Sequence, residues 1–299
     1  MAQPTPHNTY LPGYKEVGHH EWRTAENSAP YLLPTLQSLA ETNPSLTLLD
    51  VGAGSGTITT SLAKHIPQGH MTAIDLSPDI LSRAASHAAS VNATNITFQP
   101  ASVYELTQTF GPAAFDVVHA HQVLCHLDAP VQALAQMLAV VKPGGVVAVR
   151  EIDMRVWSFY PFSETMRAWV EVQKATHAAA GGSNEAGPSL VAWAMRAGAR
   201  REDVKASMGT WLYATEEERR VWGKFWMGIG GDWLRRMADL TPLVQALRSE
   251  TGLWAVKCGR RHWSWALRRK LSWIAWARSG KGGWRRKTPA AGLCMVRSL

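Results

Sequence analysis

The sequence has few cysteines, no long apolar run and, over its last 49 residues, no acidic side chain. Its three cysteines, Cys125, Cys258 and Cys294, form no close pair, which argues against a disulfide framework or a zinc ribbon and favours the reducing cytoplasm. No stretch approaches the roughly 18 consecutive apolar residues of a membrane span. The polar start, Met1–Tyr14, does not resemble a secretory signal. What is present, 46% hydrophobic and 18% charged residues, is typical of a globular chain.

Charge divides the chain into two kinds of sequence. Residues 251–299 hold twelve Lys or Arg side chains and six of the fourteen Trp residues. The other 250 residues hold 19 basic and all 23 acidic side chains, so the net charge of +8 comes from the tail. The body and the tail therefore need separate interpretations.

Apolar periodicity in the body alternates between strand and helix patterns. Helices are expected near 29–42 (broken early by Pro34), 57–65, 78–91, 131–141, 165–180 and 189–197, and strands over 46–51, 70–76, 96–99, 115–121, 146–152 and 204–214. A turn at 142–145 precedes the fifth strand. Strands separated by helices predict an α/β fold with a doubly wound, mostly parallel sheet.

Ligands of such sheets bind beyond the carboxyl ends of the strands, and the first strand ends in the Gly-rich turn Asp50–Gly56. Glycine lets a ligand approach the backbone, and the following helix offers free N–H groups. Asp75, at the end of the second strand, can accept hydrogen bonds from both hydroxyls of a ribose. Its alternative role is to cap the helix that starts at Pro78, but Ser77 is the better cap, so we favour the ribose contact. A nicotinamide dinucleotide is the first alternative, but Thr57 stands where its motif needs glycine.

The spacing Asp-x-Gly-x-Gly-x-Gly resembles the first motif of class I S-adenosylmethionine-dependent methyltransferases, which have a Rossmann-like fold. Within them the chain is similar to the ubiquinone/menaquinone-biosynthesis C-methyltransferase branch over roughly residues 10–222, on the segments 20–29, 48–60, 115–128 and 140–153. The resemblance implies S-adenosyl-L-methionine as the cofactor. It implies cofactor contacts from Asp50 (near the ammonium), Gly52, Ala53, Gly54, Ser55, Gly56, Asp75, Leu76, Ala101, Ser102, Val103 and His121.

One pair departs from the family pattern. Where the family has Gly-Asp after the third strand, with the carboxylate on the adenine amino group, this chain has Ala101-Ser102. A neutral hydrogen bond contributes about 1 kcal/mol against about 1.5–3 for a charged one, so we expect roughly tenfold weaker cofactor binding.

Candidate catalytic groups follow the fourth and fifth strands. His121 and His126 are the candidate bases, and Glu151 and Asp153 lie beside the expected acceptor site. His20, Trp22 and Arg23 match the family's lid, and Trp157 belongs to an aromatic acceptor wall that also includes Phe159, Tyr160, Phe162, Met166 and Trp169. A structural role is at least an equal alternative for the two histidines, and core packing explains most of the aromatic side chains equally well. For the N-terminal segment the alternative is a solvated helix face, and the resemblance favours the lid.

A metal site is not expected. His119 and His121 share one face of a strand, but Cys125 and His126 lie beyond its end, and the spacing matches no familiar zinc pattern.

The basic, Trp-rich tail has three interpretations. It could bind nucleic acid or lie on a membrane surface as an amphipathic helix, or it could be a misread reading frame, the interpretation we favour. Codons permitted for Lys287–Leu299, read in a shifted frame, can encode a segment similar to the terminal strand of the family. In that case the last strand would be missing and a sheet edge exposed.

These observations predict methyl transfer from S-adenosylmethionine to a small, apolar metabolite in specialised metabolism. The predicted organisation is an N-terminal helical lid at 1–45, a methyltransferase domain at 46–222 with an acceptor-site insertion near 154–200, and the atypical tail at 223–299. The alternatives are a nicotinamide-dependent oxidoreductase and a non-catalytic protein that binds S-adenosylmethionine or nucleic acid. Nucleic acid is not the expected partner.

Overall fold

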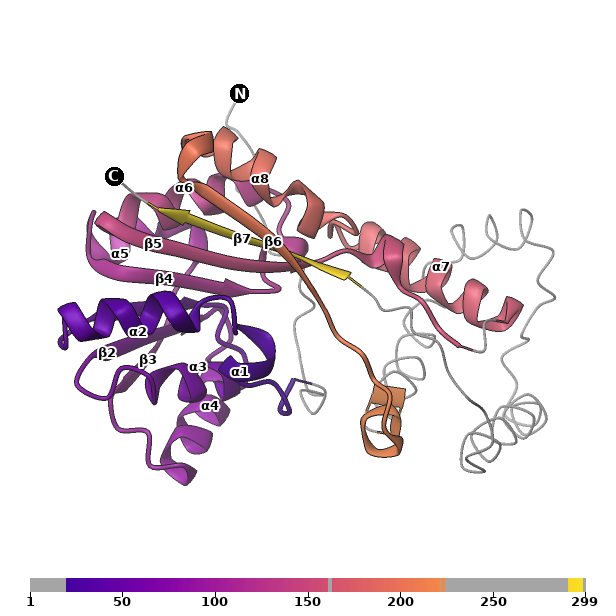
Figure 1. Ribbon diagram of the computed structural model, residues 1–299, viewed down its shortest axis with the longest axis horizontal. Coiled ribbons are helices and arrows are strands. Elements are labelled where there is room, and N and C mark those ends of the chain that lie inside the picture. Colours follow the sequence, from indigo (N-terminus) through magenta and orange to yellow (C-terminus); the bar gives the residue numbers. More distant parts are fainter. Residues whose placement is uncertain (1–19, 161–162, 221, 224–289, 298–299) are drawn as a thin grey trace. The chain divides into compact units, whose positions relative to one another are not determined.

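The computed structural model describes residues 20–160, 163–220, 222–223 and 290–297 (Figure 1). Contacts divide the chain into two compact units, Met1–Leu212 with Lys287–Leu299, and Tyr213–Arg286. In the second unit, Thr215 and Glu218 exchange hydrogen bonds between side chain and backbone at a helix start. Most of the predicted atypical tail, residues 224–289, lies outside the described residues.

The first unit is built on a seven-stranded sheet with the order β3-β2-β1-β4-β5-β7-β6 (Figure 1). The first five strands in this order are parallel, and β7 is antiparallel to β5 and β6. The strands are β1 (Thr47–Val51), β2 (His70–Asp75), β3 (Ile96–Pro100), β4 (Phe115–His121), β5 (Val141–Ile152), β6 (Val204–Thr210) and β7 (Ala290–Arg297). The predicted doubly wound, mostly parallel sheet is confirmed.

Eight α-helices and four short 3-10 helices connect the described strands. The α-helices are α1 (Ala25–Ser28), α2 (Leu33–Thr42), α3 (Thr57–Ala63), α4 (Pro78–Ser90), α5 (Leu106–Phe110), α6 (Pro130–Val140), α7 (Glu164–Ala179) and α8 (Ala186–Arg196). The 3-10 helices are η1 (Val103–Glu105), η2 (Leu124–His126), η3 (Met154–Val156) and η4 (Arg201–Asp203).

Two local predictions need correction. The helix expected over 29–42 starts only at Leu33, because Pro34 stands in the first turn of α2, where its missing N–H costs nothing, and the separate short helix α1 ends before the expected range. The turn expected at 142–145 is part of β5, which starts at Val141 and carries a register shift against β4. There Lys142 reaches back to Asp116, with Nζ 2.9 Å from the carboxylate.

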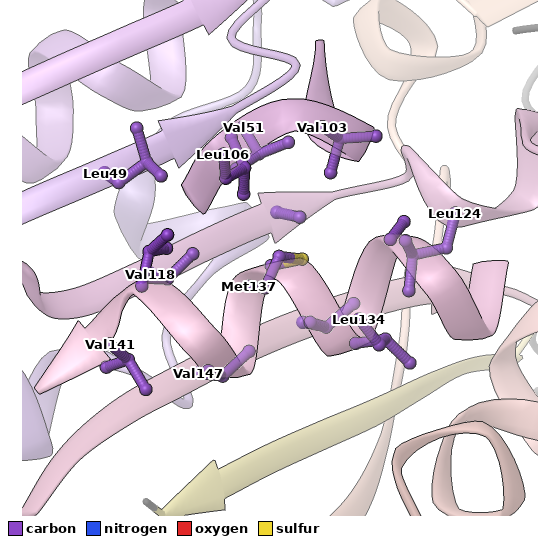
Figure 2. Packing of buried hydrophobic residues seen from close by; sticks show 14 of the residues in the cluster. Leu49, Val51, Val103, Leu106, Val118, Leu124, Leu134, Met137, Val141 and Val147 are labelled. Atoms are coloured by element: carbon purple, nitrogen blue, oxygen red, sulfur yellow. The ribbon is translucent and has the colours of Figure 1, made fainter. Parts of the chain in front are cut away.

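Alternate residues of the central strands face opposite sides of the sheet, so both faces are apolar. Leu49 of β1, Val118 of β4 and Val147 of β5 pack with Leu134 and Met137 of α6 in one buried cluster (Figure 2). Strands buried on both faces are typical of parallel sheets covered by helices on each side.

The opposite face packs against the N-terminal helices. Leu48 of β1, Val117 of β4 and Val146 of β5 form a second buried cluster with Leu36 of α2 and Leu62 of α3. The polar residues that continue these strands on this face, among them Asp50 and His121, are therefore also enclosed by protein.

The sequence left open whether the last strand is present, and the structure has it. β7 pairs with β5 on one side, from Val146 opposite Arg297 to Ile152 opposite Ala291, and with β6 on the other. The mostly apolar segment of β7 is typical of a strand with neighbours on both edges. The edge of β5 is thus covered, and the reading-frame hypothesis, which concerns the message, stays a prediction.

No helix among the described residues combines the length and the apolar character that a membrane crossing requires.

Candidate functional site

A cavity of about 280 Å³ opens at the carboxyl ends of β1, β2 and β3. It lies beside the point where the strand order reverses between β1 and β4, the usual ligand position in open parallel sheets. Its walls come from the segments that follow β1, β2, β3 and β4: Val51, Gly52, Ile74, Asp75, Leu76, Ala101, Ser102, Val103, Tyr104, Val123 and Leu127. Six of the predicted cofactor residues line it.

The Gly-rich turn after β1 bends through left-handed backbone conformations. Gly54 has φ +54°, and a Cβ there would meet nothing within 4 Å, so its backbone is open to a ligand. Gly56 has φ +78°, and a Cβ there would lie 2.8 Å from Cβ of Ala84, which allows α3 to start close against α4. Ala53 and Ser55 belong to the same turn, where Ser55 is buried.

Asp75 joins this turn to the end of β2. Its Oδ2 accepts from the Gly54 N–H at 3.2 Å and its Oδ1 from the Ser77 N–H at 3.2 Å. Burial raises the pKa of the carboxyl above its ordinary value. Each oxygen accepts only one of these bonds, so Asp75 keeps acceptor capacity for hydroxyl groups at the cavity wall.

Asp50 has a different environment from the one its motif position implied. Its Oδ2 accepts from the Thr59 hydroxyl at 2.6 Å, and its Oδ1 lies 2.8 Å from Nδ1 of His119. The carboxylate is buried beneath the turn and is not among the cavity residues. The Asp50 side chain therefore joins β1 to α3 and β4 inside the protein.

Ser102 lies at the cavity and also starts the next element. Its hydroxyl accepts from the Tyr104 N–H at 3.2 Å and so caps η1. Ala101 and Val103 flank it in the wall. The position therefore suits any short side chain with a capping oxygen.

His121 is buried but does not line the cavity. Neither ring nitrogen has a hydrogen-bond partner among the described residues. Burial, followed by the nearby charges of Arg23 and Arg150, holds the pKa of His121 well below its ordinary value, so the ring is neutral. Its nearest aromatic neighbour is Trp211, with ring centroids 5.8 Å apart.

The predicted lid residues converge on the same indole. Trp22 meets Trp211 edge to face at 5.7 Å, and the Arg23 guanidinium lies 5.2 Å from its centroid. The carbonyl of His20 accepts from the Thr57 hydroxyl at 3.2 Å, which fixes the segment to the first turn of α3. The lid segment is thus anchored beside the Gly-rich turn.

Two carboxylates, one within β5 and one just after it, hold loops in place. Glu151 is fully buried, and its Oε1 accepts from the N–H groups of Val123 (2.9 Å) and Leu124 (2.6 Å). Burial raises its pKa to about 7. Asp153 is paired with Arg155, whose hydrogen bonds lower the pKa of Asp153 although burial alone would raise it.

An aromatic group follows β5. Trp157 stacks on Trp169 of α7 at 5.9 Å, and Phe159 meets Trp169 edge to face at 5.7 Å. Tyr160 is 66% exposed, and Phe162 lies outside the described residues. α8, at the end of the expected insertion 154–200, packs instead on the sheet through Leu190 and Ala194.

The histidines weighed as metal ligands are separated into two sites. His119 bonds to Asp50, and its ring is 6.5 Å from that of His121. His126 lies with Cys125 in η2, where its Nδ1 is 3.3 Å from Nε2 of His177 on α7. Burial lowers the pKa of His126 to about 3.

Sequence reasoning missed Trp211 and His177. Each meets its partners across a long stretch of chain: the Trp211 indole N–H donates to the carbonyl of Asn27 at 3.0 Å, and His177 reaches His126. The only signal in the sequence was the residue type and its position: Trp211 is an aromatic residue near the end of an expected strand, and His177 is a metal-ligating residue near the end of an expected helix. Val123 and Leu127 of the cavity wall could have been found from their place just after the fourth strand.

Comparison with known proteins identifies the family. A family model described as a methyltransferase domain matches residues 42–203. An uncharacterised methyltransferase of Schizosaccharomyces pombe is 32% identical over 230 residues, which cover 74% of this chain and 79% of that protein. The chain belongs to the methyltransferase domain family.

Two further comparisons agree. A ubiquinone biosynthesis O-methyltransferase of Albidiferax ferrireducens is 34% identical over 112 residues, 38% of this methyltransferase and 43% of the relative, so the match spans less than half of that enzyme. A crystal structure assigned to a methyltransferase of Bacillus halodurans C-125 has a TM-score of 0.50 and 16% identity, with 89% of this chain and 97% of that chain covered, which supports the fold. The predicted class, a methyltransferase dependent on S-adenosylmethionine, is confirmed, and the nicotinamide alternative is set aside.

We expect Asp75→Asn to weaken binding of S-adenosylhomocysteine about 10- to 100-fold, because a charge-assisted hydrogen bond contributes about 1.5–3 kcal/mol. Isothermal titration calorimetry measures the change. Asp79→Asn, which neutralises an exposed carboxylate in the first turn of α4, is the matched control and leaves the affinity unchanged. Equal affinities for wild type and Asp75→Asn would refute the ribose contact.

We expect Ser102→Asp to tighten binding of the same ligand roughly tenfold, because it replaces a neutral acceptor with a charged one. Asp is as good a helix cap as Ser, so η1 keeps its start. Ser163→Asp makes the same exchange at the cap of α7 and serves as the control. An unchanged or weaker affinity would show that position 102 does not face the adenine amino group.

Proposed function

We propose that this methyltransferase methylates a small, apolar metabolite in the reducing cytoplasm, as a step of specialised metabolism. The observation that carries the proposal is the pairing of a polar cavity, with Asp75 and Ser102 in its wall, and an aromatic group made by Trp157, Phe159 and Trp169. The first suits a nucleoside, and the second offers apolar surface to an acceptor.

The chain's own residues bind and orient. Asp75 would accept the ribose hydroxyls, Ser102 the adenine amino group, and the Gly52–Gly56 turn would lie behind the methionine portion. S-adenosylmethionine supplies a methyl group bound to a positively charged sulfur, already activated for transfer. The protein then has to hold the acceptor in line with the carbon–sulfur bond. Such positioning can lower the activation free energy by about 7–11 kcal/mol.

Trp22, Arg23 and Trp211 form the adjoining cover. Two guanidinium groups lie near the Trp211 ring, that of Arg150 at 4.3 Å and that of Arg23 at 5.2 Å from its centroid. We assign these side chains the role of excluding water, because transfer to water would waste the cofactor.

His121 is the residue we propose as proton acceptor. Its neutral, buried ring has two nitrogens without hydrogen-bond partners in the described part of the chain. If the acceptor must lose a proton when it takes the methyl group, that proton would pass to a His121 nitrogen. His126 is assigned below to another site.

The acceptor class is tested with methyl-labelled S-adenosylmethionine and two acceptor sets of equal size, one of neutral aromatic hydroxy compounds and one of carboxylates. We expect label in the neutral set. Trp157→Ala should lower kcat/KM roughly tenfold or more through lost apolar contact, with unchanged S-adenosylhomocysteine affinity. Met208→Ala, a 73% exposed position, is the control. Preference for the carboxylates would contradict the proposal.

The role of His121 is tested by His121→Asn, which keeps a hydrogen-bonding group but removes the base. With an acceptor that must lose a proton we expect kcat to fall about 100-fold or more, while S-adenosylhomocysteine affinity stays the same. His87→Asn on α4 is the control. If kcat and its pH profile are those of wild type, His121 has only a structural role.

A further inference from the structure

Three metal-ligating side chains meet outside the cofactor cavity. Cys125 and His126 stand next to each other in η2, and His177 comes from the last turn of α7. The thiol sulfur and one nitrogen of each ring lie within 4.8 Å of one another. Among the described residues no other group of three or more His, Cys, Asp or Glu side chains comes together in this way.

The tautomer of His177 is set by Asn184. The amide nitrogen of Asn184 donates to the Lys174 carbonyl at 2.9 Å, so its oxygen faces Nδ1 of His177 at 3.0 Å and accepts from it. The proton of the neutral ring is therefore on Nδ1, and Nε2 presents a lone pair toward His126. Hydrogen bonding of the remote ring nitrogen is how proteins orient metal-binding histidines.

Backbone hydrogen bonds hold the two elements together. The Ser183 N–H donates to the Cys125 carbonyl at 2.8 Å, and the Met154 N–H donates to the Asn184 carbonyl at 2.9 Å. A Cβ at Gly182 would lie 2.5 Å from Nε2 of His177 and 2.7 Å from the two ring carbons beside it, which places it over the ring face. Glycine at 182 thus lets the chain close tightly while the in-line direction of the lone pair stays open.

The spacing fits a tetrahedral ion. With metal–nitrogen bonds of 2.0–2.1 Å, two ligands of a tetrahedral Zn²⁺ have nitrogens about 3.3 Å apart. Nδ1 of His126 and Nε2 of His177 are 3.3 Å apart. The two nitrogens therefore already have the separation that a shared ion requires.

Charged side chains lie near the site. The Glu151 carboxylate is close to the Cys125 thiol and has one buried oxygen without a hydrogen-bond partner in the described part of the chain. A Cys125 thiolate and the Glu151 carboxylate would together offset two positive charges. Arg23 adds the opposing charge, which a bound ion must outweigh.

We propose that Cys125, His126 and His177 bind one Zn²⁺-class ion, through one sulfur and two imidazole nitrogens, with a fourth position left for water or another ligand. Binding replaces the thiol S–H bond with a sulfur–metal bond, and the proton goes to the buffer. The ion would fasten α7 to η2. Since Val123 and Leu127 flank η2 and line the cavity, it would also stiffen that wall.

The test uses the full chain without an affinity tag, freed of metal with a chelator and titrated with Co²⁺ and then Zn²⁺. We expect one Co²⁺ per chain, a thiolate-to-cobalt charge-transfer band in the near ultraviolet, and displacement by Zn²⁺. Cys125→Ser and His177→Gln should each abolish the band. Asn184→Ala, which keeps all three ligands, should weaken binding about 10- to 100-fold. Cys258→Ser, a thiol outside the described residues, is the control and keeps the band.

Stability gives an independent readout. Zn²⁺ should raise the urea midpoint of wild type and Cys258→Ser but not of Cys125→Ser, because only a folded chain with the complete site gains binding free energy. Circular dichroism of the metal-free variants checks that they fold. Absence of a stoichiometric cobalt band in wild type, or a band that survives both Cys125→Ser and His177→Gln, would overturn the proposal whether or not the protein transfers methyl groups.

Discussion

Carboxylates at or beyond the ends of parallel strands hold this site together, because loops that follow neighbouring strands leave backbone N–H groups that need acceptors. One Asp75 oxygen accepts from a backbone N–H of the turn after β1, and the other accepts from the segment before α4. A single Glu151 oxygen accepts from two backbone N–H groups of the segment after β4. The positions of both cavity walls therefore depend on two side chains that the loops themselves do not contain.

The central strands separate two electrostatic environments. Asp50 and His119 continue the face that packs on α2 and α3, where the Asp50 carboxylate pairs with Nδ1 of His119 and accepts from the Thr59 hydroxyl. Asp75 ends β2 at the mouth of the cavity, where its charge stays accessible to a ligand. The structure thus separates a buried acid that pairs with protein groups from an acid that lines the cavity, although both stand at the carboxyl end of a strand.

Local patterns in the sequence were sufficient for the first six strands, the Gly-rich turn and Asp75, because each depends on a short segment. Ser102 was predicted from the family resemblance, and β7, whose partners β5 and β6 are distant in the sequence, was left open. Local patterns failed where partners are distant. Trp211 reaches Asn27, and no periodicity links the two. The direction of the Asp50 carboxylate depends on Thr59 and His119, so the motif alone could not decide whether it faces the ligand or the interior.

The short helix η2 contacts the hydrophobic core, the cavity wall and α7. Its first residue, Leu124, is fixed by Glu151 and packs in the core with α6, while Val123 and Leu127 on either side form the cavity wall. Its other two residues turn toward α7, which carries Trp169 of the aromatic group as well as His177. A three-residue element has too few contacts to hold its own conformation. Its geometry must come from the carboxylate below it and the helix beside it, so whatever fixes His177 to η2 also fixes the aromatic group relative to the cofactor cavity.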